Sequence, residues 1–274
     1  MPHTELAPAK VNLALHVLGR RDDGYHELDS IVAFADVADR LTFEEAEDWR
    51  LDISGPFADG LTNGPDNLVL RAAFAFAGAY PHRAYRITLE KNLPVASGIG
   101  GGSADAAAAL RALARLAGVT DDMTKLARGL GADVPVCLLG RTCRMRGIGD
   151  AIDIIEGVAP MPAVLVNPGV ALATAAVFAR LALRPGAKAF SGIVAGADPA
   201  AGRNDLAAAA LALAPVIGEA TAALERQSDL RFARMSGSGA TCFGVFASAE
   251  AAAIAARRIA GAHPNWWVVA TIIG

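Results

Sequence analysis

Apolar and polar positions alternate along the first third of the chain, as they do in strands that bury one face. In residues 5–18 this alternation places Lys10 and Asn12 on the same face of a predicted strand. Strand-like runs follow between residues 30 and 54, and residues 85–90 alternate again. Because strands dominate the beginning and helical spacing takes over later, the sequence predicts an α+β fold class.

Helical spacing and turn residues divide the remainder of the chain. Helices are predicted at residues 67–79, 106–117, 121–130, 174–183, 204 to about 225 and 249–260. Short strands are predicted at residues 141–146, 151–156, 163–167, 232–235, 241–246 and 266–273. Pro160 and Pro162 precede one apolar strand, and a chain of 274 residues suffices for two domains. We therefore expect an N-terminal domain of residues 1–159 and a C-terminal domain of residues 160–274.

The composition favours a protein that binds small molecules. The formal net charge is −3, and basic residues form no long run, so the electrostatic footprint of a nucleic-acid binder is missing. The longest apolar stretch, Leu206 to Gly218, contains Pro215 and is shorter than the about 20 residues of a membrane span. Residues 1–5 lack the basic and apolar pattern of a secretory signal. We expect no membrane partner and a cytoplasmic location.

Cysteines and lysines are few, and both residue types carry information. Cys137, Cys143 and Cys242 have no CxxC spacing, which argues against a disulfide framework and a zinc site, so we expect buried thiols. Only four of the 25 basic residues are lysines, namely Lys10, Lys91, Lys125 and Lys188. A lysine in a special position therefore needs an explanation that arginine would not satisfy.

A glycine-rich loop, residues 94–105, reads P-V-A-S-G-I-G-G-G-S-A-D and joins a predicted strand to a predicted helix. Glycines let a bulky anion approach the backbone, and Ser103 is the predicted N-cap of a helix whose N-terminus favours phosphate. The loop is neither a Walker A motif nor a dinucleotide fingerprint, because no Gly-Lys-Ser/Thr closes it and Ser103 replaces the third glycine. If the loop sequence is considered by itself, a flexible turn that merely joins strand to helix is an equally good interpretation. The candidate nucleotide-binding residues here are Pro94, Ser97, Gly98, Gly100, Gly101, Gly102 and Ser103.

Two charged residues have both a structural and a chemical interpretation. Lys10 lies among apolar residues of its strand, where a lysine usually lies at an edge with its charge in water. Asp133 stands two residues before Pro135, which is typical of a helix N-cap, although a carboxylate held there also suits a general base. The residues alone leave these alternatives open.

Two loops have similar alternatives. Tyr25 and His26 stand side by side in a polar loop, where they can stack and hydrogen-bond a base or lie on an ordinary surface. Residues 236–239, S-G-S-G, lie between two predicted strands and form either a simple hairpin or a second anion-binding turn.

Four motifs in a fixed order bring these stretches together. P-A-K-V-N at residues 8–12, the glycine-rich loop, G-A-D-V-P at 131–135 and M-S-G-S-G-A at 235–240 resemble the motifs of the GHMP small-molecule kinases. Within that family the chain resembles the members that act on a cytidine diphosphate-linked methylerythritol in the non-mevalonate isoprenoid pathway. The resemblance implies a two-domain GHMP kinase fold with the active site in the interdomain cleft.

The resemblance also implies roles for individual residues. ATP, with Mg²⁺, is expected on the glycine-rich loop and near Asn67, and phosphate is transferred to the 2-hydroxyl of the methylerythritol unit. Lys10 and Asp133 match the catalytic pair. The positions that match substrate-binding residues are Asn12, Tyr25, His26, Thr174, Phe178, Gly237, Ser238 and Gly239. The metal ligands are not readable, although Ser103 is the nearest hydroxyl, and Asp105 has no assigned role.

Departures from the family pattern, at Ser97, Ile99, Ser236 and Ser238, are small and leave the class intact. Two alternatives remain. A sister kinase for mevalonate, homoserine or a sugar has no use for an aromatic clamp made by Tyr25, His26 and Phe178. A nucleotide- or sugar-binding regulator without catalysis would be favoured by the loss of Lys10 or Asp133, and both residues are present.

Overall fold

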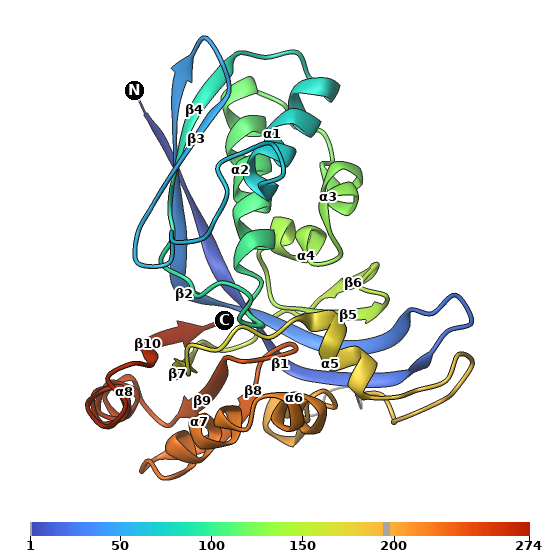
Figure 1. Cartoon of the computed structure of the whole chain (residues 1–274), viewed down its shortest axis with the longest axis vertical. Helices are drawn as coiled ribbons and strands as arrows, with labels where there is room; N and C mark the ends of the chain where they lie inside the picture. The colour runs from blue at the N-terminus through green and yellow to red at the C-terminus, as the bar shows by residue number, and fades with distance from the viewer. Residues whose placement is uncertain (1, 194–197) are drawn as a thin grey trace. The chain divides into compact units, whose positions relative to one another are not determined.

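The computed structural model describes residues 2–193 and 198–274 (Figure 1). The chain forms two compact units. Unit 1 comprises the residues up to Ala9, Val37–Val95 and Gly100–Gly140, and unit 2 comprises Lys10–Asp36, Ala96–Ile99 and Arg141–Gly274. Two long strands, β1 (His3–Arg20) and β2 (His26–Ala46), contribute residues to both units. Each unit is therefore assembled from separate segments of the chain. The division into domains of residues 1–159 and 160–274 stays a prediction.

Unit 1 joins a strand layer to a group of helices. Its elements, besides its parts of β1 and β2, are β3 (Arg50–Ser54), α1 (Leu68–Ala79), β4 (Ala84–Glu90), α2 (Gly101–Ala117), α3 (Thr124–Leu130) and α4 (Val134–Leu139). Strand β4 pairs with β2 antiparallel and with β3 in parallel. Helix α2 packs on α1 and α4, and its buried residues 106–109 are all alanine, which permits close approach.

The start of α2 corrects one prediction. Ser103 was expected to be its N-cap, but the helix begins at Gly101 and the N-cap is Gly100. Gly100 has φ +67°, a left-handed conformation that favours glycine, so the chain turns into the helix three residues earlier than predicted. Ser103 therefore lies inside the first turn, with its side chain partly exposed.

Unit 2 is built on an antiparallel sheet in the order β2-β10-β7-β9-β8. Its further strands are β5 (Cys143–Gly147), β6 (Ala151–Ile154), β7 (Met161–Asn167), β8 (Leu230–Met235), β9 (Cys242–Phe246) and β10 (Trp267–Ile273). Its helices are α5 (Thr174–Arg180), the short η1 (Pro199–Ala201), α6 (Ala207–Leu213), α7 (Val216–Glu225) and α8 (Ala249–Ala262). Helices α7 and α8 pack on this sheet.

Three elements differ from the sequence prediction. The helix predicted from residue 204 to about 225 is two helices, α6 and α7, because Pro215 lacks the N–H that would continue the ladder. The strand-like runs from residue 30 to 46 form one continuous strand, β2. Helix α4 begins directly after Asp133, as one of the two interpretations of that residue expected, but its end was not predicted because its six residues, V-P-V-C-L-L, are apolar throughout and show no helical period.

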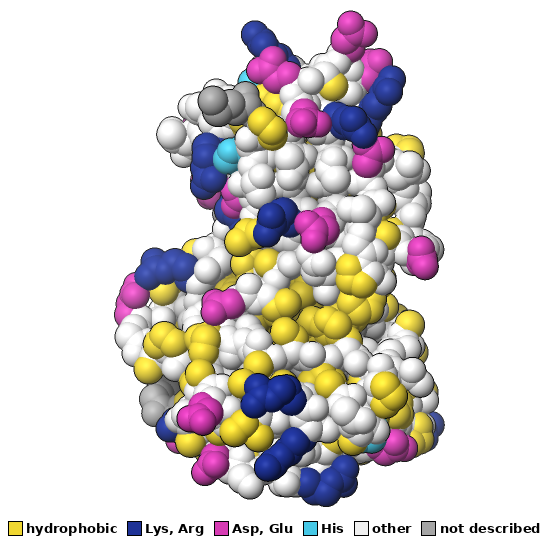
Figure 2. All heavy atoms as spheres, turned by 90° about the vertical axis from the view of Figure 1, so that its left-hand side faces the viewer, with side chains coloured by type: hydrophobic (Ala, Val, Ile, Leu, Met, Phe, Trp, Pro, Cys, Tyr) yellow, Lys and Arg dark blue, Asp and Glu magenta, His cyan; other side chains and the backbone are white. Residues whose placement is uncertain are grey.

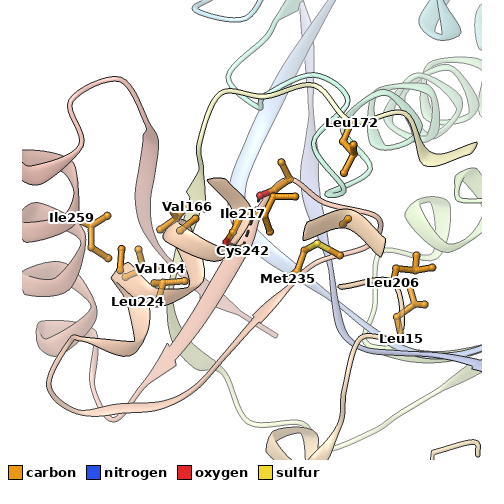
Figure 3. Close-up of a cluster of buried hydrophobic side chains, with 14 of the residues drawn as sticks. Leu15, Val164, Val166, Leu172, Leu206, Ile217, Leu224, Met235, Cys242 and Ile259 are labelled. Carbon is orange, nitrogen blue, oxygen red and sulfur yellow. Dashed lines mark hydrogen bonds between the residues drawn. The ribbon is translucent and has the colours of Figure 1, made fainter. Parts of the chain in front are cut away.

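A cluster of buried apolar side chains fills unit 2 between its sheet and helices (Figure 3). Val164 and Val166 of β7 meet Ile217 and Leu224 of α7 there. Cys242 also belongs to the cluster, and its burial raises the pKa of its thiol to about 11. Cys137 and Cys143 are likewise buried and form no disulfide, so the prediction of buried thiols is confirmed.

The charges on the surface are mixed. On the face shown in Figure 2, lysine and arginine side chains are interspersed with aspartate and glutamate, in keeping with the net charge of −3. Within residues 2–193 and 198–274, no helix is long and apolar enough to cross a membrane.

Candidate active site

The middle of the glycine-rich loop, Ala96–Ile99, is held by the S-G-S-G turn within unit 2. Ser236 Oγ donates to the carbonyl of Gly98 at 3.0 Å, and Thr241 N donates to the carbonyl of Ser97 at 3.0 Å. Gly98 has φ +77°, and a Cβ on it would lie 2.5 Å from the carbonyl oxygen of Ser236. Only glycine fits this position, so the loop is held in one conformation by its neighbours, while its role in phosphate binding stays a prediction.

The end of the loop passes into α2 within unit 1. Ala104 N donates to the carbonyl of Gly100 at 2.8 Å, which closes the first turn of the helix. The N–H groups at the start of a helix have no partner inside it, and the dipole there favours negative charge. Gly102 is exposed at this end, and a Cβ on it would meet only Leu68 Cδ1, at 3.5 Å. A phosphate can therefore approach the backbone over Gly102.

Gly102→Val is expected to fold normally and to weaken binding of a non-hydrolysable ATP analogue by more than about tenfold, because its side chain would occupy the phosphate position. Isothermal titration calorimetry measures this loss. Gly129→Val in α3 is the matched control, since Gly129 is also an exposed helical glycine with nothing within 4 Å of its Cβ position. Unchanged affinity in folded Gly102→Val would place the phosphates elsewhere.

Lys10 and Asn12 lie buried on β1 in unit 2. Lys10 is 4% exposed, so its interpretation as an edge lysine with its charge in water is wrong. Its N–H donates to the carbonyl of Ile99 at 2.9 Å, which ties this strand to the loop. Burial raises the pKa of the Cys143 thiol to about 11, and the positive charge of Lys10 opposes that rise.

Asn12 joins three segments of unit 2. Its N–H donates to Ser236 Oγ at 3.1 Å, and its Nδ2 donates to Ser30 Oγ at 2.8 Å. Asn12 Oδ1 is buried without a hydrogen-bond partner in the described part of the chain. A buried acceptor without a donor is costly, so this oxygen is suited to a ligand's hydroxyl.

Asp133 stands at the N-cap position of α4 in unit 1, with Pro135 in the first turn. This is the position that the N-cap interpretation expected, although the Asp133 side chain makes no capping hydrogen bond to α4. Asn67, by contrast, caps α1, because its Oδ1 accepts from Val69 N at 2.9 Å. Asp133 belongs to unit 1 and Lys10 to unit 2, and their catalytic pairing stays a prediction.

The structure brings together His26 and Phe178, two of the three residues expected to enclose a base. Their ring centroids are 4.8 Å apart and their planes are tilted by 35°. Burial, assisted by the positive charge of Arg20, lowers the pKa of His26 below its usual 6.5, so the ring is neutral at pH 7 and above. His26 Nε2 is buried and has no hydrogen-bond partner in residues 2–193 and 198–274. Tyr25 is 63% exposed, so its side chain is accessible to a ligand.

Thr174 and the S-G-S-G turn also meet in unit 2. Thr174 Oγ1 and Ser238 Oγ share a hydrogen bond of 2.9 Å. Gly237 and Gly239 have φ +54° and +88°, which lets the turn present its backbone closely. Asn204, for which no sequence motif predicted a role, holds this turn by donating from Nδ2 to the carbonyl of Gly237 at 2.8 Å.

Asp105, which had no role from the sequence, is buried one turn into α2. Its Oδ2 accepts from Lys91 Nζ at 2.6 Å, and the same ammonium pairs with Asp39. Burial raises the pKa of Asp105 to about 7; Lys91 opposes this rise and Asp39 adds to it. Lys91 and Asp39 were missed as well. The rarity of lysine in this chain was the one sequence signal that could have drawn attention to Lys91.

The sequence also matches known proteins over its whole length. Residues 67–141 match the GHMP kinases N terminal domain, and residues 189–265 match the GHMP kinases C terminal domain. The 4-diphosphocytidyl-2-C-methyl-D-erythritol kinase of Parvibaculum lavamentivorans is 50% identical, over 100% of this chain and 99% of that protein.

Solved structures agree with these matches. A crystal structure of 4-(cytidine 5'-diphospho)-2C-methyl-D-erythritol kinase is similar with a TM-score of 0.85 and 36% identity, over 99% of both chains. A homoserine kinase from Cytophaga hutchinsonii has a TM-score of 0.73 at 18% identity, over 98% of this chain and 94% of that one, which shows a shared fold alone. The predicted mixed fold of strands and helices is confirmed. This chain therefore belongs to the GHMP kinase family, in the same group as the 4-diphosphocytidyl-2-C-methyl-D-erythritol kinases.

Proposed function

We propose that the chain transfers the γ-phosphate of ATP to the 2-hydroxyl of 4-diphosphocytidyl-2-C-methyl-D-erythritol, a step of isoprenoid precursor synthesis by the non-mevalonate route. The observation that carries the choice of substrate is the ring pair of His26 and Phe178, with His26 Nε2 buried and unpartnered in the described residues. A cytosine offers a face for stacking and an edge for hydrogen bonding. Mevalonate, homoserine and galactose have no aromatic base.

ATP binds along the glycine-rich loop in this proposal, with its phosphates at the N-terminus of α2. Two features support this position. Gly98 and Gly100 have positive φ, which the loop needs to direct its N–H groups at an anion, and exposed Gly102 leaves the helix end open. Asn67 lies at the N-cap of α1 in unit 1, and its proposed place near the nucleotide rests on the family motif.

Lys10 and Asp133 carry out the chemistry in this proposal. Phosphoryl transfer requires mainly the positioning of the reacting groups and the neutralisation of charge. Asp133, at the N-cap position of α4, accepts the proton of the attacking hydroxyl. Lys10 stabilises the negative charge that develops as the hydroxyl attacks the phosphate. The burial of Lys10, at 4% exposed, supports this role because an ammonium screened from water acts more strongly.

Mg²⁺ is expected with the ATP phosphates, and the residues present fit such an ion. Mg²⁺ usually keeps several waters and takes one or two protein oxygens besides the phosphates, so a dedicated cage is not needed. Ser103, partly exposed in the first turn of α2, is the proposed protein ligand. When bound, the ion neutralises part of the charge on the transferred phosphate.

The remaining substrate contacts are proposed in unit 2. Asn12 Oδ1, buried without a partner in the described residues, accepts a hydrogen bond from a hydroxyl of the methylerythritol unit. Thr174 and Ser238, whose hydroxyls meet at 2.9 Å, contact the diphosphate together with Gly237 and Gly239. A cytoplasmic location also stays a prediction.

Tyr25→Ala is expected to raise the KM for the cytidine substrate by about 5- to 150-fold, which corresponds to the roughly 1 to 3 kcal/mol that stacking on an aromatic side chain contributes. Because Tyr25 is 63% exposed, its loss should change the melting temperature little. Steady-state kinetics with each substrate varied in turn tests this. Phe74→Ala, another exposed aromatic, in α1, is the control. An unchanged KM, or an equal rise in the KM for ATP, would reject the aromatic clamp.

A further inference from the structure

Unit 1 contains a buried group of three charged side chains, hereafter the ionic triad: Lys91, Asp39 and Asp105. Lys91 Nζ lies 2.6 Å from Asp105 Oδ2 and also forms an ion pair with Asp39. The side chains are 3%, 0% and 4% exposed for Lys91, Asp39 and Asp105. They come from three separate elements, because Lys91 follows β4, Asp39 lies in β2 and Asp105 lies in α2.

Within the ionic triad, Lys91 and Asp39 are held in place by hydrogen bonds to the backbone of the sheet and of the segment that follows β4. The N–H of Lys91 donates to the carbonyl of Ser54 at 2.7 Å, next to the parallel pairing of β3 with β4. Asp39 Oδ1 accepts from the N–H groups of Asn92 and Leu93, at 2.5 and 2.8 Å. The backbone around Lys91 is therefore bonded on both sides, and its ammonium is anchored to the sheet.

Asp105 is the residue of the ionic triad that belongs to α2, the helix whose N-terminus is proposed to bind the phosphates of ATP. It lies four residues after Gly101, hence about one turn along the same face of α2. A Cβ on Gly101 would lie 3.0 Å from Lys91 Nζ, so the ammonium lies directly against the first residue of the helix. The contact between Lys91 Nζ and Asp105 Oδ2 therefore joins the beginning of α2 to the segment that follows β4.

A contribution to the stability of the fold is a poor explanation for the burial of these three charged side chains. Burial would lower the pKa of Lys91, but Asp105 and Asp39 raise it, so the ammonium stays charged. One ammonium buried with two carboxylates is expensive to desolvate, and apolar replacements of such groups are often neutral or stabilising. Their directional contacts instead specify one arrangement of the elements they join.

We infer that Lys91 is a positioning residue for ATP, which acts through Asp105 to hold the N-terminal turn of α2 in the orientation that receives the phosphates. The inference rests on the proposed binding of ATP at this helix end. It assigns no contact between Lys91 and the nucleotide. Loss of the link should therefore weaken ATP binding and leave the binding of the cytidine substrate unchanged.

Asp105→Leu tests the inference because it removes the link but leaves the balanced pair of Lys91 and Asp39. We expect the Kd of a non-hydrolysable ATP analogue, and the KM for ATP, to rise by about tenfold, while the KM for the cytidine substrate changes by less than about twofold. A merely structural role would reduce the folded fraction, which lowers the apparent kcat and leaves both KM values unchanged.

Arg111→Leu is the matched control, because Arg111 also anchors α2. Its Nε forms an ion pair with Glu5 Oε1 at 2.8 Å, and Arg111 lies about 15 Å along the helix from Gly101. It should lower the melting temperature without changing the KM for ATP. Asp105→Asn keeps an acceptor for the Lys91 ammonium, but a neutral acceptor bonds about half as strongly as a carboxylate. This variant should therefore weaken ATP binding by about threefold, to an affinity between those of the wild-type protein and Asp105→Leu.

Wild-type affinity for the ATP analogue in folded Asp105→Leu would overturn the inference, as would equal rises of both KM values or the same rise in Arg111→Leu. If the leucine variant does not fold, wild-type affinity in Asp105→Asn overturns it. The proposed function fails separately, when the wild-type protein does not bind the analogue or Gly102→Val binds it normally.

Discussion

Asp133→Asn is expected to lower kcat by about 10² to 10⁴, the range that a positioned general base contributes. The substitution keeps the shape of the side chain but removes the carboxylate that would accept the hydroxyl proton. Asparagine is also well suited to the N-cap position that Asp133 occupies, so the change should cost the fold little. Transition-state stabilisation would be lost without ground-state binding, so both KM values should change much less than kcat.

Pre-steady-state measurement of ADP formation separates this loss from slow product release. Asp66→Asn, at an exposed aspartate just before the cap of α1, is the control for the loss of one negative charge in the same unit. Asp133→Asn with more than about a tenth of wild-type kcat would fall outside the expected range and contradict the assignment of the base.

Lys10→Arg is expected to lower kcat by about 10² to 10³, the usual loss when one preorganised electrostatic group is removed. If Lys10 supplied only positive charge, arginine would serve, since 21 of the 25 basic residues are arginines. A compact ammonium can contact several oxygens at once, whereas the wider planar guanidinium favours a bidentate grip on one partner. The KM values should change less than kcat.

Lys10 is 4% exposed, so the larger arginine also strains its surroundings and kcat must be referred to folded enzyme. Lys125→Arg, on the exposed side of α3, controls for the exchange itself and should be silent. A folded Lys10→Arg enzyme that retains more than about a third of wild-type kcat would contradict a catalytic role for Lys10.

Local patterns predicted the elements whose residues follow one period. The alternation in β1 and β4 was readable, and so was a helix that begins at Asp66 or Asn67, because each depends on residues close together in sequence; the structure shows Asn67 to be the cap of α1. Pro215 interrupts a run of alanine and leucine whose helical spacing continues on both sides, so spacing alone merged α6 with α7. Gly100, not Ser103, caps α2 because the chain turns left-handed there, which the residue types did not reveal.

The site was readable where a motif is contiguous and unreadable where distant residues meet. The glycine-rich loop and the S-G-S-G turn stood out in the sequence, but the hydrogen bond from Ser236 to Gly98 spans 138 residues. The ionic triad joins Asp39 and Lys91 across 52 residues, and only the pairing of β2 with β4 brings them together. Hydrophobic periodicity carries no information on such polar contacts.

A coupled assay of ADP release tests the proposed kinase activity most directly. The wild-type protein is given ATP and Mg²⁺ with 4-diphosphocytidyl-2-C-methyl-D-erythritol, mevalonate, homoserine or galactose in parallel reactions. We predict rapid ADP release with the cytidine substrate alone and a product phosphorylated at the 2-hydroxyl, as ³¹P NMR would identify. A comparable kcat/KM with any of the other three substrates, or no ADP release with the cytidine substrate, would contradict the proposed function.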